Sequence, residues 1–290
     1  MDSKEFGALI KALRSQSLDP SGSPWSREKL AHALGLSSTQ LGRLERGDRK
    51  YLDNQTMLGL AECFNLTNLE TRELFFAACG LSDRELYSEV EHSQQINRLI
   101  KVMGNLRVPS VVVDVYGDVV AAPAGSLALY GVSDSKLAEL RENPVRLNIV
   151  NHVYSLDYLY RGDQASWRET ADLAMLYFRR STLRYRHKPY FSTIYRELMK
   201  NVQFDLDWFA SQRMACKEDI SFEAASFDHP VLGPLSYIIC ETVVYTRHGE
   251  LYLIIYNPAS VHTVKVFEAL FAEGGNTIRR VAPWPEKAKQ

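Results

Sequence analysis

Apolar residues recur at helical spacing through most of the first eighty residues. Between Glu5 and Arg14 they follow a period of three to four positions, and the stretches 53–64 and 69–79 repeat that pattern. Two shorter periodic segments lie on either side of Gly35, and Gly80 follows the last one. The pattern therefore predicts five helices, with a loop over 15–24 where prolines and glycine interrupt it.

The stretch 26–47 predicts two short helices around a tight turn. Leu30 and Leu34 share one face of the first helix, and Gly35 can end that helix in the left-handed conformation. Ser37 is a suitable N-cap for the second helix, whose buried face is expected to be Leu41 and Leu44. Helices of about two turns are marginal alone, so both must pack against neighbouring helices.

The outward face of the second short helix is polar, with Ser38, Thr39, Arg43 and Arg46. A helix that presents such side chains is the device that reads base edges in the DNA major groove. The alternative is an ordinary solvated face, since polar helix faces are common. Residues 1–50 carry nine Lys or Arg against six Asp or Glu, and residues 51–80 carry one against four, so the basic end coincides with this helix.

A motif joins these features: Leu-Ala-x-x-Leu-Gly-Leu-Ser-x-x-x-Leu-x-x-Leu-Glu-x-Gly, from Leu30 to Gly47. It resembles the helix-turn-helix of the Xre and phage-repressor family. The resemblance implies that Ser38, Thr39 and Arg43 face bases, that Arg27 meets a phosphate, and that Glu45 pairs with an arginine of the opening helix, for which Arg14 is the obvious partner. The candidate DNA-binding residues are Arg27, Ser37, Ser38, Thr39, Arg43 and Arg46.

The run from Ser82 to Leu106 is compatible with one connecting helix. Its apolar positions are Leu86, Val90, Ile96, Leu99, Ile100 and Met103. They form either a dimer seam or a stripe that packs only on its own chain, and the sequence leaves both open.

Strand patterns begin at Val108. Residues 108–122 predict a hairpin around Tyr116-Gly-Asp118, and helical stretches follow over 127–130, 135–141, 147–159, 165–183, 190–199 and 205–214. Three antiparallel strands are expected over 221–227, 235–245 and 250–256, then a closing helix over 267–271 and a loose tail.

A hairpin, several helices and three more strands suggest a PAS-like sensor. Asn148, Trp167, the helix from Phe191 to Leu198, Phe204, Trp208, the turn His229-Pro-x-x-Gly233 and the closing aromatic strand resemble the ligand-binding domain of MmyB-like transcription regulators. That family joins such a domain to an Xre-type helix-turn-helix in the same order. The resemblance implies an α+β fold: an N-terminal all-α helix-turn-helix bundle joined by a connecting helix to a PAS-like antiparallel sheet with helical cover.

The resemblance also implies an apolar small-molecule ligand, with a long-chain fatty acid as the best candidate. The helices between the strands are rich in large apolar residues that either line a pocket or fill a core. The candidate ligand-binding residues are Val150, Tyr154, Trp167, Ala171, Met175, Phe178, Arg180, Arg184, Phe191, Ile194, Leu198, Phe204 and Trp208.

The basic run 179–188 offers arginines that could hold a carboxylate. Arg179, Arg180, Arg184 and Arg186 are the candidates. The same run is also typical of a solvated helix end, where cations offset the helix dipole, or of a second nucleic-acid patch with Tyr185 and Tyr190.

Other chemistry finds little support in the sequence. The four cysteines show no C-x-x-C spacing, and His152, His187 and His229 do not form a pair at metal-ligand spacing, so we expect core thiols, structural histidines and no metal site. No nucleophile elbow, phosphate loop or H-E-x-x-H motif is present, so we expect no catalytic residues. No signal peptide or apolar run of membrane length appears, so we expect a cytoplasmic protein without membrane insertion.

The sequence therefore predicts four regions: a helix-turn-helix domain over 1–80, a connecting or dimerisation helix over 81–106, a PAS-like ligand-binding domain over 107–275, and a flexible tail over 276–290. The predicted function is a homodimeric regulator that binds double-stranded DNA at a near-palindromic operator and senses an apolar, fatty-acid-like ligand, with no other cofactor. Two alternatives remain: a second domain that serves only dimerisation or partner docking, and a small-molecule enzyme.

Overall fold

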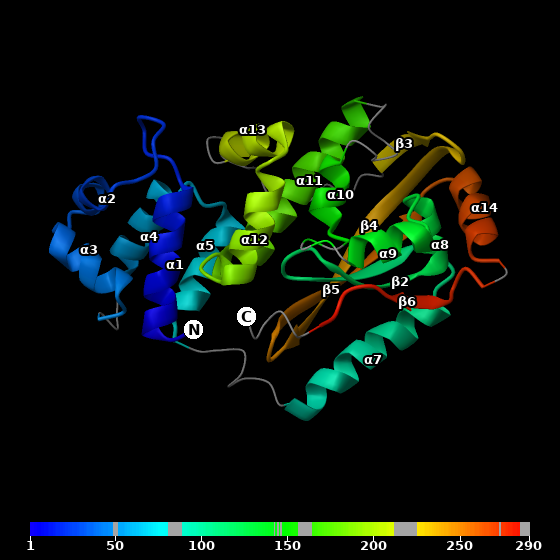
Figure 1. The fold of residues 1–290 in the computed structure, drawn as a ribbon, viewed down its shortest axis with the longest axis horizontal. Coiled ribbons are helices and arrows are strands. Elements are labelled where there is room, and N and C mark those ends of the chain that lie inside the picture. The colour runs from blue at the N-terminus through cyan, green and yellow to red at the C-terminus, as the bar shows by residue number, and fades with distance from the viewer. Residues whose placement is uncertain are drawn as a thin grey trace. The chain divides into compact units, whose positions relative to one another are not determined.

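The computed structural model describes residues 1–48, 52–80, 89–141, 143, 145, 147–155, 164–211, 225–272 and 274–284 (Figure 1). Contacts divide the chain into two compact units. The first comprises Met1–Leu86 with Met175–Asp219, and the second comprises Tyr87–Ala174 with Ile220–Gln290. In the described part of the chain, no helix has the length and apolar character needed to cross a membrane.

Among the described residues, five helices form the N-terminal bundle of the first unit. They are α1 (Ser3–Gln16), α2 (Arg27–Ala33), α3 (Ser38–Glu45), α4 (Asn54–Cys63) and α5 (Asn68–Ala78). Each begins at a polar N-cap whose side chain accepts backbone N–H groups of the first turn: Asp2, Ser26, Ser37, Asp53 and Thr67. The five predicted helices are therefore confirmed, because each apolar stripe is preceded by a cap.

The bundle is held by one apolar core with a close approach between α1 and α3. Leu9 and Leu13 of α1 are buried with Leu41 and Leu44 of α3. Gly7 allows the approach, since a Cβ atom there would lie 2.5 Å from the Leu44 carbonyl oxygen. Glycine at this position therefore fixes how closely α3 sits on α1.

A helical arm, defined here as residues 175–211, completes the first unit. It contains the C-terminal part of α11 (Gln164–Thr182), the 3₁₀ turn η1 (Leu183–Tyr185), α12 (Pro189–Leu198) and α13 (Val202–Ser211). Leu183 of η1 is fully buried in the same core as the bundle residues. The arm lies in sequence inside the predicted ligand-binding range but folds with the N-terminal bundle.

The second unit is built on a six-stranded antiparallel sheet in the order β3-β4-β5-β1-β2-β6. The strands are β1 (Ser110–Asp114), β2 (Val119–Pro123), β3 (Ala225–His229), β4 (Gly233–Thr246), β5 (Gly249–Pro258) and β6 (Ile278–Arg280). The helices of this unit are α7 (Glu89–Asn105), α8 (Ala124–Leu129), α9 (Asp134–Arg141), α10 (Ile149–Tyr154), α14 (Val261–Leu270) and the N-terminal part of α11. The predicted α+β fold class is confirmed.

Helices cover both faces of the central strands. On one face lies α7 (Figure 1). Its residues Ile96, Leu99 and Met103 share a core cluster with Val112 of β1 and Leu253 of β5. The neighbouring strand residues point to the other face, where the ring of Tyr237 lies 6.3 Å from that of Phe267 in α14. Covering both faces explains why β1 is buried at every position and reads as a continuous apolar run.

The α7 contacts decide how the apolar stripe of the connecting helix is used. Its described positions pack on the sheet of their own chain, which is the second of the two alternatives. Leu86 and Val90 of the predicted stripe have side chains outside the described set.

The predicted hairpin is confirmed at residues 110–123. Val112 of β1 pairs with Ala121 of β2, and Gly117, with a φ of 82°, occupies the turn. Asn148, the N-cap of α10, donates to the Tyr116 carbonyl at 2.8 Å and to the Asp118 carboxylate at 2.9 Å. Asn148 thereby fixes the turn to the start of α10, a structural role for one of the residues that carried the family resemblance.

Part of the predicted flexible tail, residues 276–290, forms a strand. Strand β6 lies inside the range 276–290 and pairs with β2, so residues 278–280 are an ordered edge strand. The sequence did not predict β6, because its three residues, two of them arginines, are too few to show the alternation of a strand. Parts of the predicted helices over 147–159 and 205–214 and of the strand over 221–227 lie outside the described residues, as do residues 285–290.

Candidate functional sites

The turn between α2 and α3 has the predicted geometry. Gly35 follows α2 with a φ of 65°, and the N–H of Leu36 returns to the Ala31 carbonyl at 2.8 Å. Ser37 then starts α3 with a capping box, because its hydroxyl accepts the Gln40 N–H and the Gln40 side chain accepts the Ser37 N–H. Ser37 is therefore occupied in capping the helix.

The outward side of α3 carries the predicted DNA-binding residues. Leu41 and Leu44 are buried, while Thr39 and Arg43 are exposed and Ser38 is half-buried. Arg46, the C-cap, is exposed and pairs with Asp48 at 3.0 Å. The helix thus presents a short polar face, with the guanidinium of Arg43 in its last turn and that of Arg46 at its C-cap.

A cluster of three charged residues fixes the C-terminal end of α3. Glu45 is buried and accepts from Arg14 Nε at 2.5 Å and from Arg27 Nη2 at 2.9 Å. The predicted pair of Glu45 with Arg14 is confirmed as a contact. Arg27 shares the same carboxylate while its side chain remains 42% exposed, so two guanidiniums face one carboxylate beside α3.

The predicted ligand-binding residues divide between the two units. Nine lie in the helical arm of the first unit: Met175, Phe178, Arg180, Arg184, Phe191, Ile194, Leu198, Phe204 and Trp208. Four lie in the second unit: Val150, Tyr154, Trp167 and Ala171. The eleven apolar or aromatic members of this set are all buried.

The arm residues form an aromatic cluster. The ring of Phe178 stacks on Phe191 at 5.8 Å and lies 6.1 Å from the rings of both Phe204 and Trp208. Tyr195, which the sequence analysis did not select, stands edge-on to Trp208 at 5.1 Å. Three helices of the arm, α11, α12 and α13, therefore meet at Trp208.

In the second unit, contacts link Trp167, Tyr154 and Ala171. Its indole N–H donates to the Val153 carbonyl at 2.9 Å, and its ring stands edge-on to Tyr154 at 6.0 Å. The Tyr154 hydroxyl donates to the Ala171 carbonyl at 3.5 Å. These contacts join α10 to the N-terminal part of α11.

The basic run 179–188, which begins inside α11, is not a solvated helix end. Arg179, Arg184 and Arg186 are buried, and each pairs with an acidic residue of α5. Arg184 pairs with Glu73 at 2.9 Å, and its guanidinium carbon lies 4.8 Å from the centre of the Phe76 ring. The surface alternatives for this run are therefore wrong for these three arginines, because their charges are neutralised inside the first unit.

Glu70 of α5 was missed by the sequence analysis. It is fully buried and lies 2.7 Å from both Arg179 Nη2 and Arg186 Nη2. Burial raises the pKa of Glu70, but the two guanidiniums outweigh burial and hold that pKa below its ordinary value. The signal was hidden because Thr67-x-x-Glu70 is also a capping box, which accounts for an acidic residue there without any distant partner.

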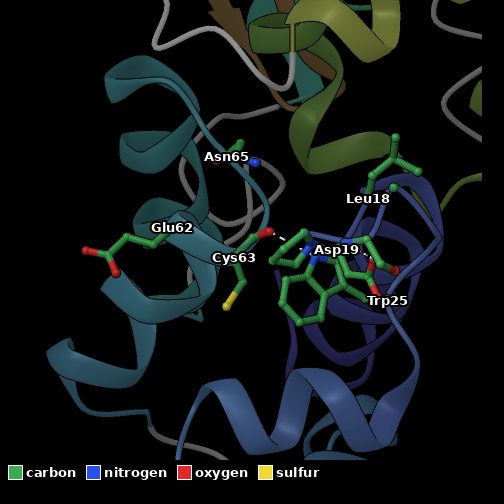
Figure 2. Close-up of a pocket in the computed structure, with 9 residues that line it drawn as sticks. Leu18, Asp19, Trp25, Glu62, Cys63 and Asn65 are labelled. Atoms are coloured by element: carbon green, nitrogen blue, oxygen red, sulfur yellow. Dashed lines mark hydrogen bonds between the residues drawn. The ribbon is translucent and has the colours of Figure 1, made fainter.

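A hollow of about 660 Å³ opens on the N-terminal bundle (Figure 2). Figure 2 shows the Trp25 ring against Cys63, whose carbonyl accepts the indole N–H at 3.0 Å. The ionisable groups Asp19 and Glu62 are acidic, and burial raises the pKa of the Cys63 thiol, so the lining disfavours an anion. Within the described chain, none of the predicted ligand-binding residues lines it.

Of the three histidines expected to have structural roles, His229 has one. His229 Nδ1 accepts the N–H groups of Val231 and Leu232 at 3.0 Å, and Nε2 donates to the Leu129 carbonyl at 3.1 Å. Burial lowers the pKa of His229, which keeps this neutral form. Across the described residues, no group of three His, Cys, Asp or Glu side chains could hold a metal ion.

Comparison with known proteins identifies one family. The model of the MmyB-like transcription regulator ligand binding domain matches residues 93–270, which is more than half of the chain. No curated protein matches the chain. The matched family describes the ligand-binding domain of regulators and not an enzyme. The chain therefore belongs to the family of proteins that carry the ligand-binding domain of MmyB-like transcription regulators.

Proposed function

We propose that this protein is a transcription regulator that binds a specific DNA sequence through α3, and that an apolar ligand changes its affinity for that DNA. The observation that carries the DNA half of the proposal is the polar face of α3, held on the bundle by the cluster of Glu45, Arg14 and Arg27. The family match supports the ligand half.

The geometry suits a helix in the major groove. Thr39 and Arg43 are exposed on α3, and Arg43 has the donor geometry that reads guanine. Arg27 begins α2, where its partly exposed guanidinium can bind a phosphate while Glu45 orients it. We further propose a homodimer that reads two half-sites about 34–36 Å apart, so that the operator is nearly palindromic.

The arm supplies the apolar surface for the ligand. Phe178, Phe191, Phe204 and Trp208 would contact an alkyl chain, and about a dozen buried methylenes contribute on the order of 10 kcal/mol before ordering costs. A long-chain fatty acid is the ligand that we propose. Arg180, whose side chain is only partly buried, is our candidate for its carboxylate.

The DNA half is tested by selecting duplexes from a random-oligonucleotide pool with the full chain at low ionic strength. We expect a near-palindromic sequence with two half-sites. Selected pools that share no sequence would contradict sequence-specific binding.

The ligand half is tested by thermal unfolding of the full chain with palmitate, with ligand-free buffer and octanoate as controls. Palmitate should raise the midpoint more than octanoate, because each added methylene contributes about 0.8 kcal/mol when buried. An unchanged midpoint with palmitate would favour a domain that serves only dimerisation or partner docking.

A further inference from the structure

Glu70 joins the N-terminal bundle to the helical arm through two buried arginines. Its Oε2 accepts from Arg179 Nη2 and its Oε1 from Arg186 Nη2, each at 2.7 Å, and all three side chains are at most 3% exposed. Glu70 also accepts the Thr67 N–H at 3.0 Å as part of the α5 capping box. One carboxylate therefore holds the start of α5 and two positions of the arm.

The two arginines fix further groups. Arg179 donates to the Asn65 carbonyl at 3.0 Å, beyond the end of α4, and to the Ser211 hydroxyl at 3.1 Å, at the end of α13. Arg186 donates to the Arg179 carbonyl at 2.9 Å. A buried charge that loses its partner is costly, so a displacement of the arm cannot leave α5 unaffected.

Arg186 faces the aromatic cluster on its other side. Its guanidinium carbon lies 5.1 Å from the centre of the Trp208 ring, and Trp208 in turn contacts Phe178 and Phe204. Arg186 thus contacts Trp208, one of the predicted ligand-binding residues. A ligand that entered between these rings would have to move or reorient Trp208, since the core is closely packed.

The contact between Arg186 and Trp208 also contains buried donors with unmet hydrogen bonds. Within the described part of the chain, Arg186 Nε and Trp208 Nε1 are buried and have no hydrogen-bond acceptor. Each unmet donor costs about 1–3 kcal/mol. Arg186 and Trp208 therefore each keep a donor that the described residues do not use.

We propose that Arg186 and Glu70 are positioning residues that transmit the ligand state from the aromatic cluster to the N-terminal bundle. Movement of Trp208 shifts Arg186, Arg186 shifts Glu70, and Glu70 shifts the start of α5, whose Leu74 is buried in the core that supports α3. The inference rests on the proposed function, because it requires a ligand in the cluster and DNA on α3. The ligand site in the aromatic cluster and the DNA site on α3 would both act on the position of α5. Two sites are coupled when they act on the same element in this way.

The test compares Arg186→Gln with Lys188→Gln. Arg186→Gln leaves Glu70 paired with Arg179, so no carboxylate is buried without a counter-charge. Lys188→Gln removes another ion pair between arm and bundle, with Glu5 at 2.7 Å. That pair does not include Glu70 and is only partly buried. It is therefore the matched control.

The measured quantity is the ratio of the DNA Kd with saturating palmitate to that without it, for the full chain and its selected duplex. We expect a ratio at least fivefold from one in the wild type and in Lys188→Gln, and a ratio within twofold of one in Arg186→Gln. Palmitate should still bind Arg186→Gln. A wild-type ratio in Arg186→Gln would overturn the proposal.

A second measurement separates this inference from the proposed function. Amide hydrogen exchange without ligand should be faster in both α5 and α13 of Arg186→Gln, and unchanged there in Lys188→Gln. If palmitate does not bind the wild type, the ligand class fails, while faster exchange in both helices still supports the coupling residues. Faster exchange confined to α13 would overturn the inference whatever the ligand.

Discussion

Glu70 Oε2 and Arg179 Nη2 lie 2.7 Å apart, although the two residues are separated by 109 positions in the chain. The pair lies inside the first unit, where the helical arm packs on the N-terminal bundle. A segment inside the matched ligand-binding domain thus contributes to the fold of the bundle that carries α3. Changes in the arm are therefore expected to affect the bundle directly.

Glu70→Ala should destabilise the protein strongly. It leaves Arg179 and Arg186 buried without their carboxylate and removes the α5 capping box. We expect the free energy of unfolding to fall by about 3–5 kcal/mol in urea titrations at pH 7. Glu62→Ala, at an exposed position of α4, should change it by less than about 0.5 kcal/mol, and a similarly small loss for Glu70→Ala would contradict the role of the pair.

Gly7→Ala should loosen the contact between α1 and α3. The added Cβ would meet the Leu44 and Glu45 carbonyl oxygens at 2.5 and 2.7 Å, so the helices must separate at a cost of about 1–3 kcal/mol. Gly42→Ala is the control, because its Cβ finds nothing nearer than 3.5 Å and alanine favours the helix by about 1 kcal/mol. Thermal unfolding should therefore move in opposite directions for the two variants, and equal shifts would refute the close approach.

Arg43→Ala should weaken DNA binding and relax base preference. Loss of one base contact costs about 1–3 kcal/mol, which titration against the selected duplex and single-base variants would measure. Lys11→Ala removes an exposed cation of α1 outside the predicted recognition face, so it should leave base preference as it is. Unchanged affinity and preference in Arg43→Ala would exclude the role proposed for this side chain.

Stability should fall as the pH is lowered from 6.5 to 4, partly because of His187. Burial, reinforced by the charge of Lys188, lowers the pKa of His187 to about 4 in the folded state, below its ordinary value of 6.5. The unfolded chain therefore takes up a proton in this window before the folded chain does, which favours unfolding by up to about 3 kcal/mol.

His187→Gln should reduce the loss of unfolding free energy between pH 6.5 and 4. His32→Gln, at an exposed position of α2, should not reduce it. Urea titrations at pH 4.5, 5.5 and 7 would show the difference. Parallel stability curves for His187→Gln and the wild type would contradict the burial argument.

Local signals allowed much of the fold to be predicted. The N-caps, the glycine after α2 and the runs of β-branched and aromatic residues in β4 and β5 lie within or next to the elements they define. The pair of Glu45 with Arg14 was accessible only because the family motif assigns that glutamate a partner.

Long-range pairing was the part that local patterns could not supply. Nothing within reach of Thr67-x-x-Glu70 indicates that a basic run more than a hundred residues later neutralises it. The same run resembles a solvated helix end, because charge alone does not report burial. Likewise, the residues of the predicted ligand site were chosen by their apolar character, which does not assign them to either unit.

The central claim is that one chain links an apolar ligand to sequence-specific DNA binding. Its most direct test is the DNA Kd of the full-length protein for its selected duplex, titrated with and without saturating palmitate at fixed salt. The account predicts sequence-specific binding whose Kd changes at least fivefold with palmitate. An identical Kd in the presence of demonstrably bound palmitate would contradict it.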